Sequence, residues 1–360
     1  MTDRVGVLPS QALRAFVASG ALSGDPPIRA DQVQPASLDL RLGPKAWRVR
    51  ASFLPGAGRT VAERLPDFAM HEIDLREGAA LETGCVYLAP LMERLRLPAD
   101  VSGVANAKSS TGRLDLFTRV ITDRGVEFDR VEAGYDGPLY AEISPRTFSV
   151  LARAGARLTQ VRLRRGRARL TDAQLAAIHD ASGLVDGAAT IDDGLAFSVD
   201  LSGDGPIGWR AKPYSALIDL DKVDFYAPLD FWEPVRRGPG GCVILDPGAF
   251  YILMSRESVH IPPDCAAEMT PYLAVAGEFR VHYAGFFDPG FGHAAAGGAG
   301  SRGVLEVRCH EAPFALEHGQ RVGRLVYEPM AERPDILYGA TIGSTYQAQG
   351  LRLSKHFRAG

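Results

Sequence analysis

The chain is poor in cysteine, in net charge and in long hydrophobic runs. Its four cysteines, among 360 residues, form no CxxC pair and no other tight spacing. We therefore expect reduced, mostly structural thiols and no zinc site. A formal net charge of -3 argues against a general role in binding nucleic acid or membrane surfaces. No hydrophobic run approaches the length of a membrane span, and the first residues lack the apolar core of a signal peptide, so we expect a cytoplasmic protein.

Glycine and proline, by contrast, are abundant, with 39 and 24 copies. They separate short runs of β-branched and aromatic residues, for example at 86–90 and 101–105, which is typical of strands joined by tight turns. One early stretch, residues 8–22, instead predicts a helix, because it carries an apolar stripe and Gly20 ends it. The composition therefore predicts a mainly β protein with short helices.

The sequence pattern starts over near residue 170. A second capped helix is predicted at 170–183, and Ser198-Val-Asp-Leu201 echoes Ser37-Leu-Asp-Leu40. Identical residues then recur at a constant offset of 164: Gly84 and Gly248, Tyr87 and Tyr251, Pro98 and Pro262, Asp100 and Asp264, Glu142 and Glu306, Gly155 and Gly319, Arg157 and Arg321. A fixed offset over such a length indicates a duplication. We therefore predict two copies of one β-rich domain, at 1–168 and 169–360.

The stretch Asn106–Arg113 concentrates groups that bind phosphate. It contains two cations, three hydroxyls and a glycine that keeps the backbone open. The candidate phosphate ligands are Lys108, Ser109, Ser110, Thr111 and Arg113. A turn of this composition can hold a polyphosphate with hydroxyls, amide groups and point charges. Taken alone, it is also typical of a solvated loop.

A second motif follows this stretch. Glu132-Ala-Gly-Tyr-Asp-Gly137 is a turn with an aromatic residue, Tyr135, and it leads into Leu139-Tyr-Ala-Glu-Ile143. Glu142 alternates with apolar neighbours, so we expect it to point off one face of a strand. Together the two motifs indicate a nucleotide site with a candidate general base, although such a carboxylate is also typical of a solvent-facing strand.

The order and spacing of these motifs resemble the dCTP deaminases of the dUTPase-like superfamily. Their phosphate motif reads Gly-Arg-Ser-Ser-x-x-Arg, and Ala107-Lys-Ser-Ser-Thr-Gly-Arg113 differs by Ala for Gly and Lys for Arg. Their hairpin reads Asp-Pro-Gly-Trp with the catalytic Glu seven residues after the aromatic, which is the spacing between Tyr135 and Glu142. Gln34–Gly43 also resembles the family's entry strand. The resemblance implies two tandem dUTPase-like distorted β-barrel domains with short helices.

The two copies differ in complementary places. The C-terminal copy has Tyr272-Leu-Ala-Val-Ala-Gly277 in place of the phosphate motif, so the serines, the threonine and the cations are gone. Yet its hairpin, Phe287-Asp-Pro-Gly-Phe291, is closer to the family's, and a strand with Glu306 follows it. This copy also carries a tail, residues 338–350, that resembles the family's closing segment. The tail residues with implied nucleotide contacts are Tyr338, Tyr346 and Gln349.

Sites in this superfamily are shared between neighbouring domains, which leaves two arrangements. In one, three N-terminal copies form a ring whose sites use Ser109, Arg113 and Glu142. In the other, the phosphate motif of the N-terminal copy meets Asp288 and Glu306 of the C-terminal copy. The first is favoured because it suits the threefold symmetry usual in the family. It predicts a homotrimer with Glu142 as the base.

The resemblance also implies roles for the site residues. The reacting ring lies near Ser109 and Arg113. The sugar is held by Glu132 and Tyr135, whose ring excludes a 2′-hydroxyl. A backbone carbonyl near Thr122 orients the water or the amino group. The remaining substrate contacts are predicted at Lys108, Ser110, Thr111, Tyr140, Asp288 and the tail.

The implied chemistry is hydrolysis of dCTP to dUTP and ammonia without a protein-bound metal. Zinc deaminases carry H-x-E with P-C-x-x-C, and neither pattern is present. A carboxylate must then take the proton of water and return it to the ring and the leaving amine, a role assigned to Glu142. Burial would raise its pKa toward this task. We expect Mg²⁺ to arrive with the triphosphate, and dTTP as a feedback ligand.

Three other functions stay open: hydrolysis of dUTP to dUMP, a bifunctional enzyme that takes dCTP to dUMP, and a catalytically dead regulator that binds dCTP intact. Two further motifs are given no function. Gly298–Gly303 fits GxGxxG, but no apolar strand precedes it, so it predicts a flexible hairpin loop. The arginine-rich stretch Arg162–Arg169 predicts a solvated connector between the domains and no nucleic-acid patch.

Overall fold

Strands dominate the computed structural model, which describes residues 4–271, 279–281, 285–309, 311–339 and 350–359. The α-helices are short: α1 (Ser10–Ser19), α2 (Val61–Phe68), α3 (Ser109–Gly112), α4 (Asp172–Ser182) and α5 (Pro228–Phe231). Single turns of 3-10 helix are η1 (Ala30–Gln32), η2 (Pro239–Gly241) and η3 (Ala294–Ala296). The mainly β fold with short helices is thus confirmed. Within these ranges no helix is long and apolar enough to cross a membrane.

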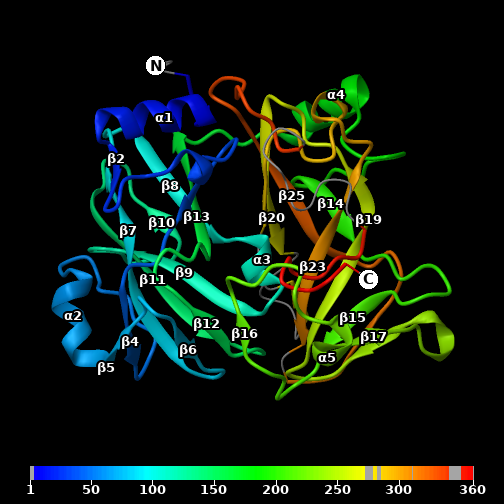
Figure 1. The fold of residues 1–360 in the computed structure, drawn as a ribbon. Coiled ribbons are helices and arrows are strands. Elements are labelled where there is room, and N and C mark those ends of the chain that lie inside the picture. Colours follow the sequence, from blue (N-terminus) through cyan, green and yellow to red (C-terminus); the bar gives the residue numbers. More distant parts are fainter. Residues whose placement is uncertain (1–3, 272–278, 282–284, 310, 340–349, 360) are drawn as a thin grey trace.

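The N-terminal half is built on two larger antiparallel sheets. One has the order β1 (Gly6–Val7), β13 (Thr159–Arg165), β8 (Val101–Ala107), β10 (Arg130–Val131), with β3 (Leu38–Leu40) also on β13. The other has the order β5 (Ala69–Asp74), β4 (Lys45–Val49), β7 (Val86–Arg96), β11 (Asp136–Pro145), β9 (Leu116–Thr122), with β2 (Leu22–Gly24) also on β7. In Figure 1 this half, coloured blue to green, lies beside the C-terminal half.

The C-terminal half repeats this strand order. Its first sheet runs β14 (Leu195–Ser198), β25 (Arg321–Pro329), β20 (Cys265–Pro271), β22 (Phe286–Phe287). Its second runs β17 (Trp232–Val235), β15 (Gly208–Ala211), β19 (Phe250–Val259), β23 (Ser301–Cys309), β21 (Phe279–Val281). The pair β6 (Ala79–Leu81) and β12 (Val150–Ala152) likewise corresponds to β18 (Val243–Leu245) and β24 (Phe314–Leu316). Strands β11 and β23, which carry Glu142 and Glu306, thus occupy equivalent places.

Local sequence explains the elements that matter for the site. In β11, Leu139, Ala141 and Ile143 are fully buried in the main core, because alternate residues of a strand share one face. Glu142 therefore points to the opposite face, as predicted. The second predicted helix is also confirmed, since the Thr171 hydroxyl and the Gln174 side chain cap α4 reciprocally.

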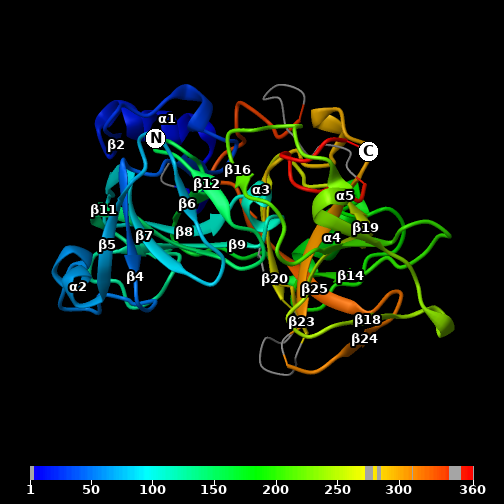
Figure 2. The same ribbon diagram turned by 60° about the horizontal axis from the view of Figure 1, so that its bottom comes forward.

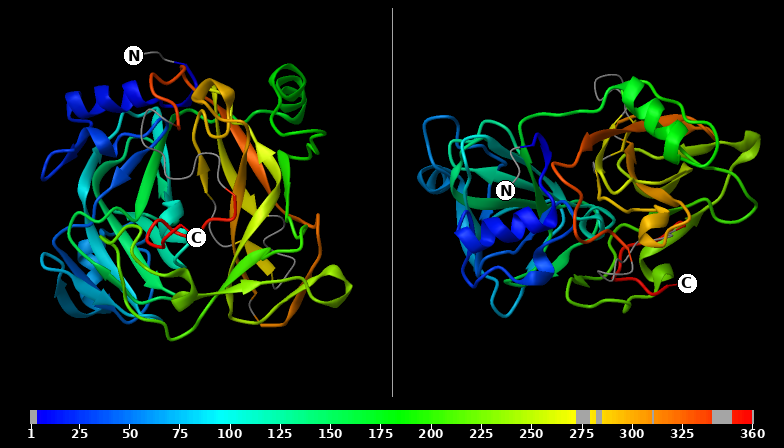
Figure 3. Two further views of the ribbon diagram at one scale, coloured as in Figure 1. Left: turned by 45° about the vertical axis from the view of Figure 1, so that its right-hand side comes forward. Right: turned by 90° about the horizontal axis from the view of Figure 1, so that it is seen from above.

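The two halves are joined by a contact that we call the seam. Strand β16 (Ile218–Asp219), from the C-terminal half, pairs in parallel with β12 of the N-terminal half. The ring of Phe148 lies 5.3 Å from that of Trp232, and the ring of Phe357 lies 5.9 Å from Trp232. Figures 2 and 3 show the C-terminal segment, in red, lying across this contact near α3. The seam fixes α3 of one half against the strands of the other.

One expectation about the junction is wrong. The arginine-rich stretch 162–169 was expected to be a solvated connector, but its first residues belong to β13 and face the other half. Arg162 has no exposed surface at all, and Arg164 is mostly buried in an ion pair with Glu328 at 2.7 Å. The charges lie inward because the C-terminal half covers this side of the sheet. By contrast, residues 298–300 do lie in a loop, as expected, whereas residues 301–303 already belong to β23.

Candidate active site

The predicted phosphate motif forms one tight turn at the seam. It starts where β8 ends, continues as α3 and leads into β9 (Figure 1). The Thr111 amide donates to the Lys108 carbonyl at 2.8 Å, which closes the turn. Ser110, Thr111 and Arg113 are buried, while Lys108 and Ser109 are partly exposed. All motif residues are thereby gathered on a short turn at the face that meets the C-terminal half.

Arg113 reaches from this turn across the seam. Its Nε lies 3.8 Å from Oε1 of Glu306 on β23, and its Nη1 donates to the Arg352 carbonyl at 3.0 Å. Arg113 is 3% exposed and Glu306 is 5% exposed. A cation of the predicted phosphate motif therefore faces a carboxylate of the other half inside a single chain.

The environment of Glu306 changes its acidity. Burial raises the pKa of this carboxyl to about 7, and the nearby Arg113 guanidinium opposes the rise without cancelling it. At 3.8 Å the Arg113 Nε is too far away to donate a hydrogen bond that would hold the carboxylate ionised. A carboxyl with such a pKa can accept and return a proton near neutral pH.

The hairpin of the C-terminal half lies on the same seam. Asp288 follows β22, is nearly fully buried, and accepts a hydrogen bond at Oδ1 from Nη2 of Arg162 at 2.9 Å. Burial raises the pKa of the Asp288 carboxyl, and Arg162 opposes the rise. Tyr338 donates its amide to the Pro289 carbonyl at 2.8 Å, and its ring lies 5.6 Å from that of Phe291. Tyr338 thus packs on the hairpin that carries Asp288.

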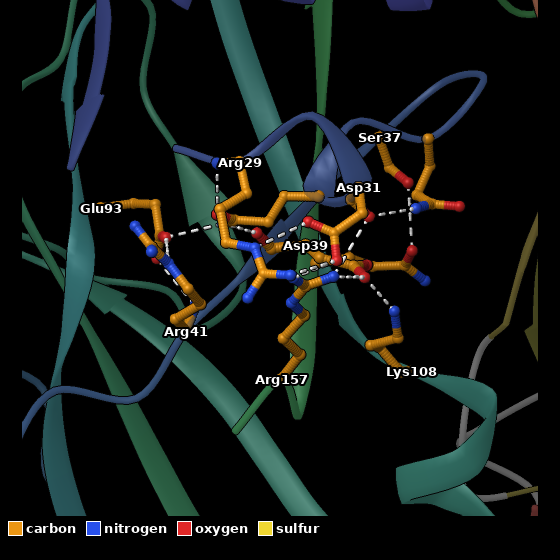
Figure 4. A network of polar contacts seen from close by, with 11 residues as sticks. Arg29, Asp31, Ser37, Asp39, Arg41, Glu93, Lys108 and Arg157 are labelled. Carbon is orange, nitrogen blue, oxygen red and sulfur yellow. Dashed lines mark hydrogen bonds and ion pairs between the residues drawn. The ribbon is translucent and has the colours of Figure 1, made fainter. Parts of the chain in front are cut away.

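A network of charges lies beside the phosphate turn (Figure 4). Asp39 on β3 is 2% exposed and pairs with Lys108, and Arg157 Nη1 lies 3.9 Å from the same carboxylate. Arg157 also pairs with Asp31 at 2.8 Å. Figure 4 shows Lys108 and Arg157 converging on Asp39 from different elements. Two cations are therefore held by a buried acid next to the motif.

The last described residues, 350–359, bring another cation to this place. Ser354 donates its hydroxyl to the Ser110 carbonyl at 2.7 Å, which docks the segment on α3. The pKa of the next residue, Lys355, is lowered, first by burial and then by the charge of Lys108. His356 is buried, and burial lowers its pKa to about 4, so it is neutral at neutral pH. Lys355 thus adds positive charge close to the phosphate turn.

Glu142 lies in different surroundings. It accepts hydrogen bonds from the Ser52 hydroxyl at 2.6 Å and from Nε of Arg119 at 3.1 Å. The Arg119 guanidinium lies over the ring of Phe128, 3.4 Å from its centroid. A separate apolar cluster, which includes Phe53 and residues of α2, surrounds this face of β11. Within one chain, Arg113 thus faces Glu306, whereas Glu142 is paired with Arg119.

Both halves of the chain match models of known protein domains. Residues 4–167 match the model of the N-terminal domain of 2′-deoxycytidine 5′-triphosphate deaminase, and residues 171–357 match the model of its C-terminal domain. The chain belongs to the dCTP deaminase family. A crystal structure of 2′-deoxycytidine 5′-triphosphate deaminase from Agrobacterium tumefaciens is similar at 57% identity and a TM-score of 0.87, over 91% of this chain and 99% of that one.

Curated members of the family resemble one part of the chain. The dCTP deaminase of Haemophilus influenzae is 30% identical over 138 residues, 36% of this chain and 67% of that protein. The dCTP deaminase of Halorubrum lacusprofundi is 32% identical over 149 residues, 40% of this chain and 70% of that protein. These proteins correspond to less than half of the duplicated chain, whereas the Agrobacterium structure covers nearly all of it.

The hairpin residues of the N-terminal half lie around another groove, of about 410 Å³. Tyr135 accepts a hydrogen bond from the Asp123 amide at 3.0 Å and donates one to the Pro138 carbonyl at 2.6 Å, and burial raises its pKa. Glu132 is exposed and pairs with Arg130 at 2.6 Å. The other predicted contacts nearby are Thr122, which lines the groove, and Tyr140, which packs on the α2 cluster. These four residues are grouped together, but apart from the Arg113–Glu306 contact.

Some predicted residues lie outside the described part of the chain, and some site residues were not anticipated. Tyr346, Gln349 and the stretch 272–277 are outside the described ranges. Within those ranges no cluster of three or more His, Cys, Asp or Glu residues fits a metal ion. Sequence reasoning missed Arg157 and Lys355. A signal existed for Arg157, which recurs at the repeat offset as Arg321, whereas nothing in the sequence distinguished Lys355.

Proposed function

We propose that this protein hydrolyses dCTP to dUTP and ammonia at the contact between its two halves. Family membership supports the reaction, and one observation supports the place: Glu306, buried with a pKa raised to about 7, faces Arg113 of the phosphate motif at 3.8 Å. The carboxylate and the cation come from different copies of the repeat. Each copy therefore contributes half of one site, which fits their complementary losses.

In the proposed reaction Glu306 is the general base. Its carboxylate takes a proton from a water molecule as the oxygen bonds to C4 of the cytosine ring, and the proton passes to ring N3. The proton of the new C4 hydroxyl then goes to the amino group, the C4 carbonyl forms and ammonia leaves, so one water and dCTP give dUTP and ammonia. Ser109 and Arg113 hydrogen-bond around the attacked carbon. Glu142, the base preferred on sequence grounds, is held by Arg119 and Ser52 and is the less suitable candidate.

The remaining groups bind the rest of the nucleotide. Lys108 and Lys355 take the triphosphate with Ser110 and Thr111, and the phosphates compete with Asp39 for Lys108. We assign the deoxyribose hydroxyl to Asp288 on the C-terminal hairpin. In this proposal Mg²⁺ arrives on the triphosphate and the tail residues Tyr346 and Gln349 close the site.

The same reasoning extends to the architecture. We infer two tandem dUTPase-like distorted barrels, with boundaries at 1–168 and 169–360. The repeated strand order and the separate family matches to 4–167 and 171–357 support this inference. A homotrimer, feedback by dTTP and a cytoplasmic location stay predictions from the sequence and the family resemblance.

The test follows all products of dCTP at once. Purified protein is incubated with dCTP and Mg²⁺, and ammonia, dUTP, dUMP and pyrophosphate are measured for the wild type, Glu306→Gln and Glu142→Gln. We expect ammonia and dUTP from the wild type and from Glu142→Gln, and none from Glu306→Gln. If only Glu142→Gln abolished the release of ammonia, the general base would be Glu142 of the N-terminal half. Release of pyrophosphate and dUMP would show that the protein also hydrolyses dUTP. Binding of dCTP without any product would instead indicate a catalytically dead regulator.

A further inference from the structure

Arg162 is a fully buried arginine that crosses the seam. It lies on β13 of the N-terminal half, and its guanidinium contacts the C-terminal half. Its Nη1 donates to the Ala267 carbonyl at 3.0 Å, and its Nη2 donates to Oδ1 of Asp288 at 2.9 Å and more weakly to the Phe287 carbonyl at 3.4 Å. Its guanidinium carbon lies 4.1 Å from the centroid of the Phe286 ring. Figure 1 shows β13 and β20, the strand of Ala267, on the facing sides of the two halves.

The repeat shows that the fold does not need an arginine at this position. At the offset of 164 the equivalent of Arg162 is Val326 on β25, and the strand registers agree: Val161 pairs with Ala105 as Leu325 pairs with Met269. In the other copy, therefore, an apolar residue occupies the equivalent strand position. A buried guanidinium is costly unless its charge and its donors are matched, so the arginine needs a partner at the seam. Asp288 supplies that partner.

The contact leaves one side of the Asp288 carboxylate available. Within the described ranges, hydrogen bonds to this carboxylate are made at Oδ1 alone, by Arg162. A carboxylate held at one oxygen by a rigid arginine can turn only slightly, so its other oxygen has a defined direction. Asp288 also lies close enough to Asp39 and Lys108, beside the phosphate turn, to feel their charges. The free oxygen is thus near the place proposed for the nucleotide.

We propose that Arg162 is a positioning residue: it holds Oδ1 of Asp288 so that Oδ2 accepts a hydrogen bond from the 3′-hydroxyl of the bound deoxyribose. This inference rests on the proposed function, because it assumes that a deoxyribonucleotide triphosphate occupies the seam. It makes recognition of the sugar depend on a side chain of the opposite half. Neither half alone then discriminates the sugar.

The chain offers a matched control. Arg164 lies on the same strand two residues away, crosses the same seam and pairs with Glu328 at 2.7 Å. Among the described residues it makes no hydrogen bond or ion pair with the hairpin of Asp288. Arg162→Met and Arg164→Met both remove an arginine from a cross-seam ion pair. A loss that reflects only weaker joining of the halves should appear in both variants, whereas a loss of sugar recognition should appear in Arg162→Met alone.

The experiment measures dissociation constants for dCTP and for 2′,3′-dideoxy-CTP by calorimetry. Each variant is made in full-length protein that also carries Glu306→Gln, which prevents turnover. We expect the Glu306→Gln parent and its Arg164→Met derivative to prefer dCTP about tenfold or more, as one hydrogen bond to a charged group implies. In the Arg162→Met derivative the preference should fall toward unity, through weaker binding of dCTP with little change for the dideoxy nucleotide. Asp288→Asn should reduce the preference as well, and its combination with Arg162→Met should add no further loss.

The outcomes separate this inference from the proposed function. An undiminished preference in Arg162→Met would overturn the inference, as would equal losses in Arg162→Met and Arg164→Met, or no preference in the parent. If the parent binds neither nucleotide, the proposed function fails first. If Arg162→Met does not fold, Arg162→Lys replaces it: a lysine keeps the charge but loses the fixed planar geometry, so an intermediate preference is expected and an unchanged one contradicts the inference.

Discussion

The raised pKa of Glu306 predicts the pH dependence of catalysis. The general base must be ionised in the free enzyme, so kcat/KM for dCTP should fall about tenfold per pH unit below a midpoint near the Glu306 pKa of about 7. An unperturbed glutamate would place this midpoint near 4.5, its ordinary value.

Removal of the neighbouring cation should move this midpoint upward. Coulomb's law for unit charges 3.8 Å apart gives about 4 kcal/mol at an effective dielectric constant of about 20, equivalent to about 3 pKa units as an upper limit. Opposite charges this close usually shift a carboxyl by about 1 to 3 units. In Arg113→Met the ionised fraction of Glu306 at pH 7 should therefore fall from about a half to between about a tenth and about a thousandth.

The assay is the initial rate of ammonia release at low dCTP, measured across pH for the wild type and for Arg113→Met. Arg113→Met also loses a contact to the reacting ring, so its rate falls at every pH, but the midpoint is independent of that loss. Arg119→Met is the matched control, because it removes the arginine paired with Glu142, the repeat equivalent of Glu306. A wild-type midpoint near 4.5, or a midpoint that Arg113→Met leaves in place, would refute the assignment.

Two further predictions concern stability and phosphate binding. Between about pH 4.5 and 7 the folded state holds a proton on Glu306 that the unfolded state has lost, so stability falls as pH rises through this window. Glu306→Gln should therefore raise the free energy of unfolding at pH 8 by roughly 2–4 kcal/mol relative to the wild type, with no difference near pH 4, by urea denaturation; an equal difference at both pH values would contradict this. Lys355→Gln should raise KM for dCTP about 3- to 10-fold at low salt and less at high salt, with kcat nearly unchanged. An unchanged KM at low salt would contradict the assignment of Lys355 to triphosphate binding.

Local sequence patterns predicted the helices and strands. The burial and pairing of the charged side chains depend instead on tertiary contacts. The capped helix α4 and the strand that carries Glu142 follow from residues within a few positions of each other. The burial of Arg162 does not, because a strand's outward face becomes a buried one only where a second half covers it. For the same reason the charge of the junction wrongly predicted a solvated connector.

The two candidate bases also differ in how the sequence presents them. Glu142 lies seven residues after Tyr135, whereas Glu306 lies fifteen residues after Phe291, because the loop that contains η3 is inserted before β23. The spacing pattern therefore favoured the N-terminal carboxylate. Spacing along the chain says nothing of which cation meets the carboxylate from elsewhere in the fold. The partner of Arg113 lies nearly two hundred residues away, and only the folded chain identifies it.

The two glutamates at equivalent strand positions have different surroundings. Glu142 accepts hydrogen bonds from Ser52 and from Arg119, so its charge is neutralised and its carboxylate is fixed. Glu306 is as deeply buried, but its cation stands 3.8 Å away, and burial dominates its pKa. The first environment holds the Glu142 carboxyl group by hydrogen bonds from two side chains, whereas the second leaves a Glu306 carboxyl group that exchanges a proton near neutral pH.

This contrast has a consequence for the seam. Because the cation of the pair belongs to one half and the carboxylate to the other, the distance between them is set by how the halves pack. The contact of Phe148 with Trp232 and the pairing of β16 with β12 are therefore part of what fixes the proposed site, although neither touches it. The proposed shared site needs such rigid joining, since a shift of about 1 Å in a catalytic pair is enough to lower a rate about a hundredfold.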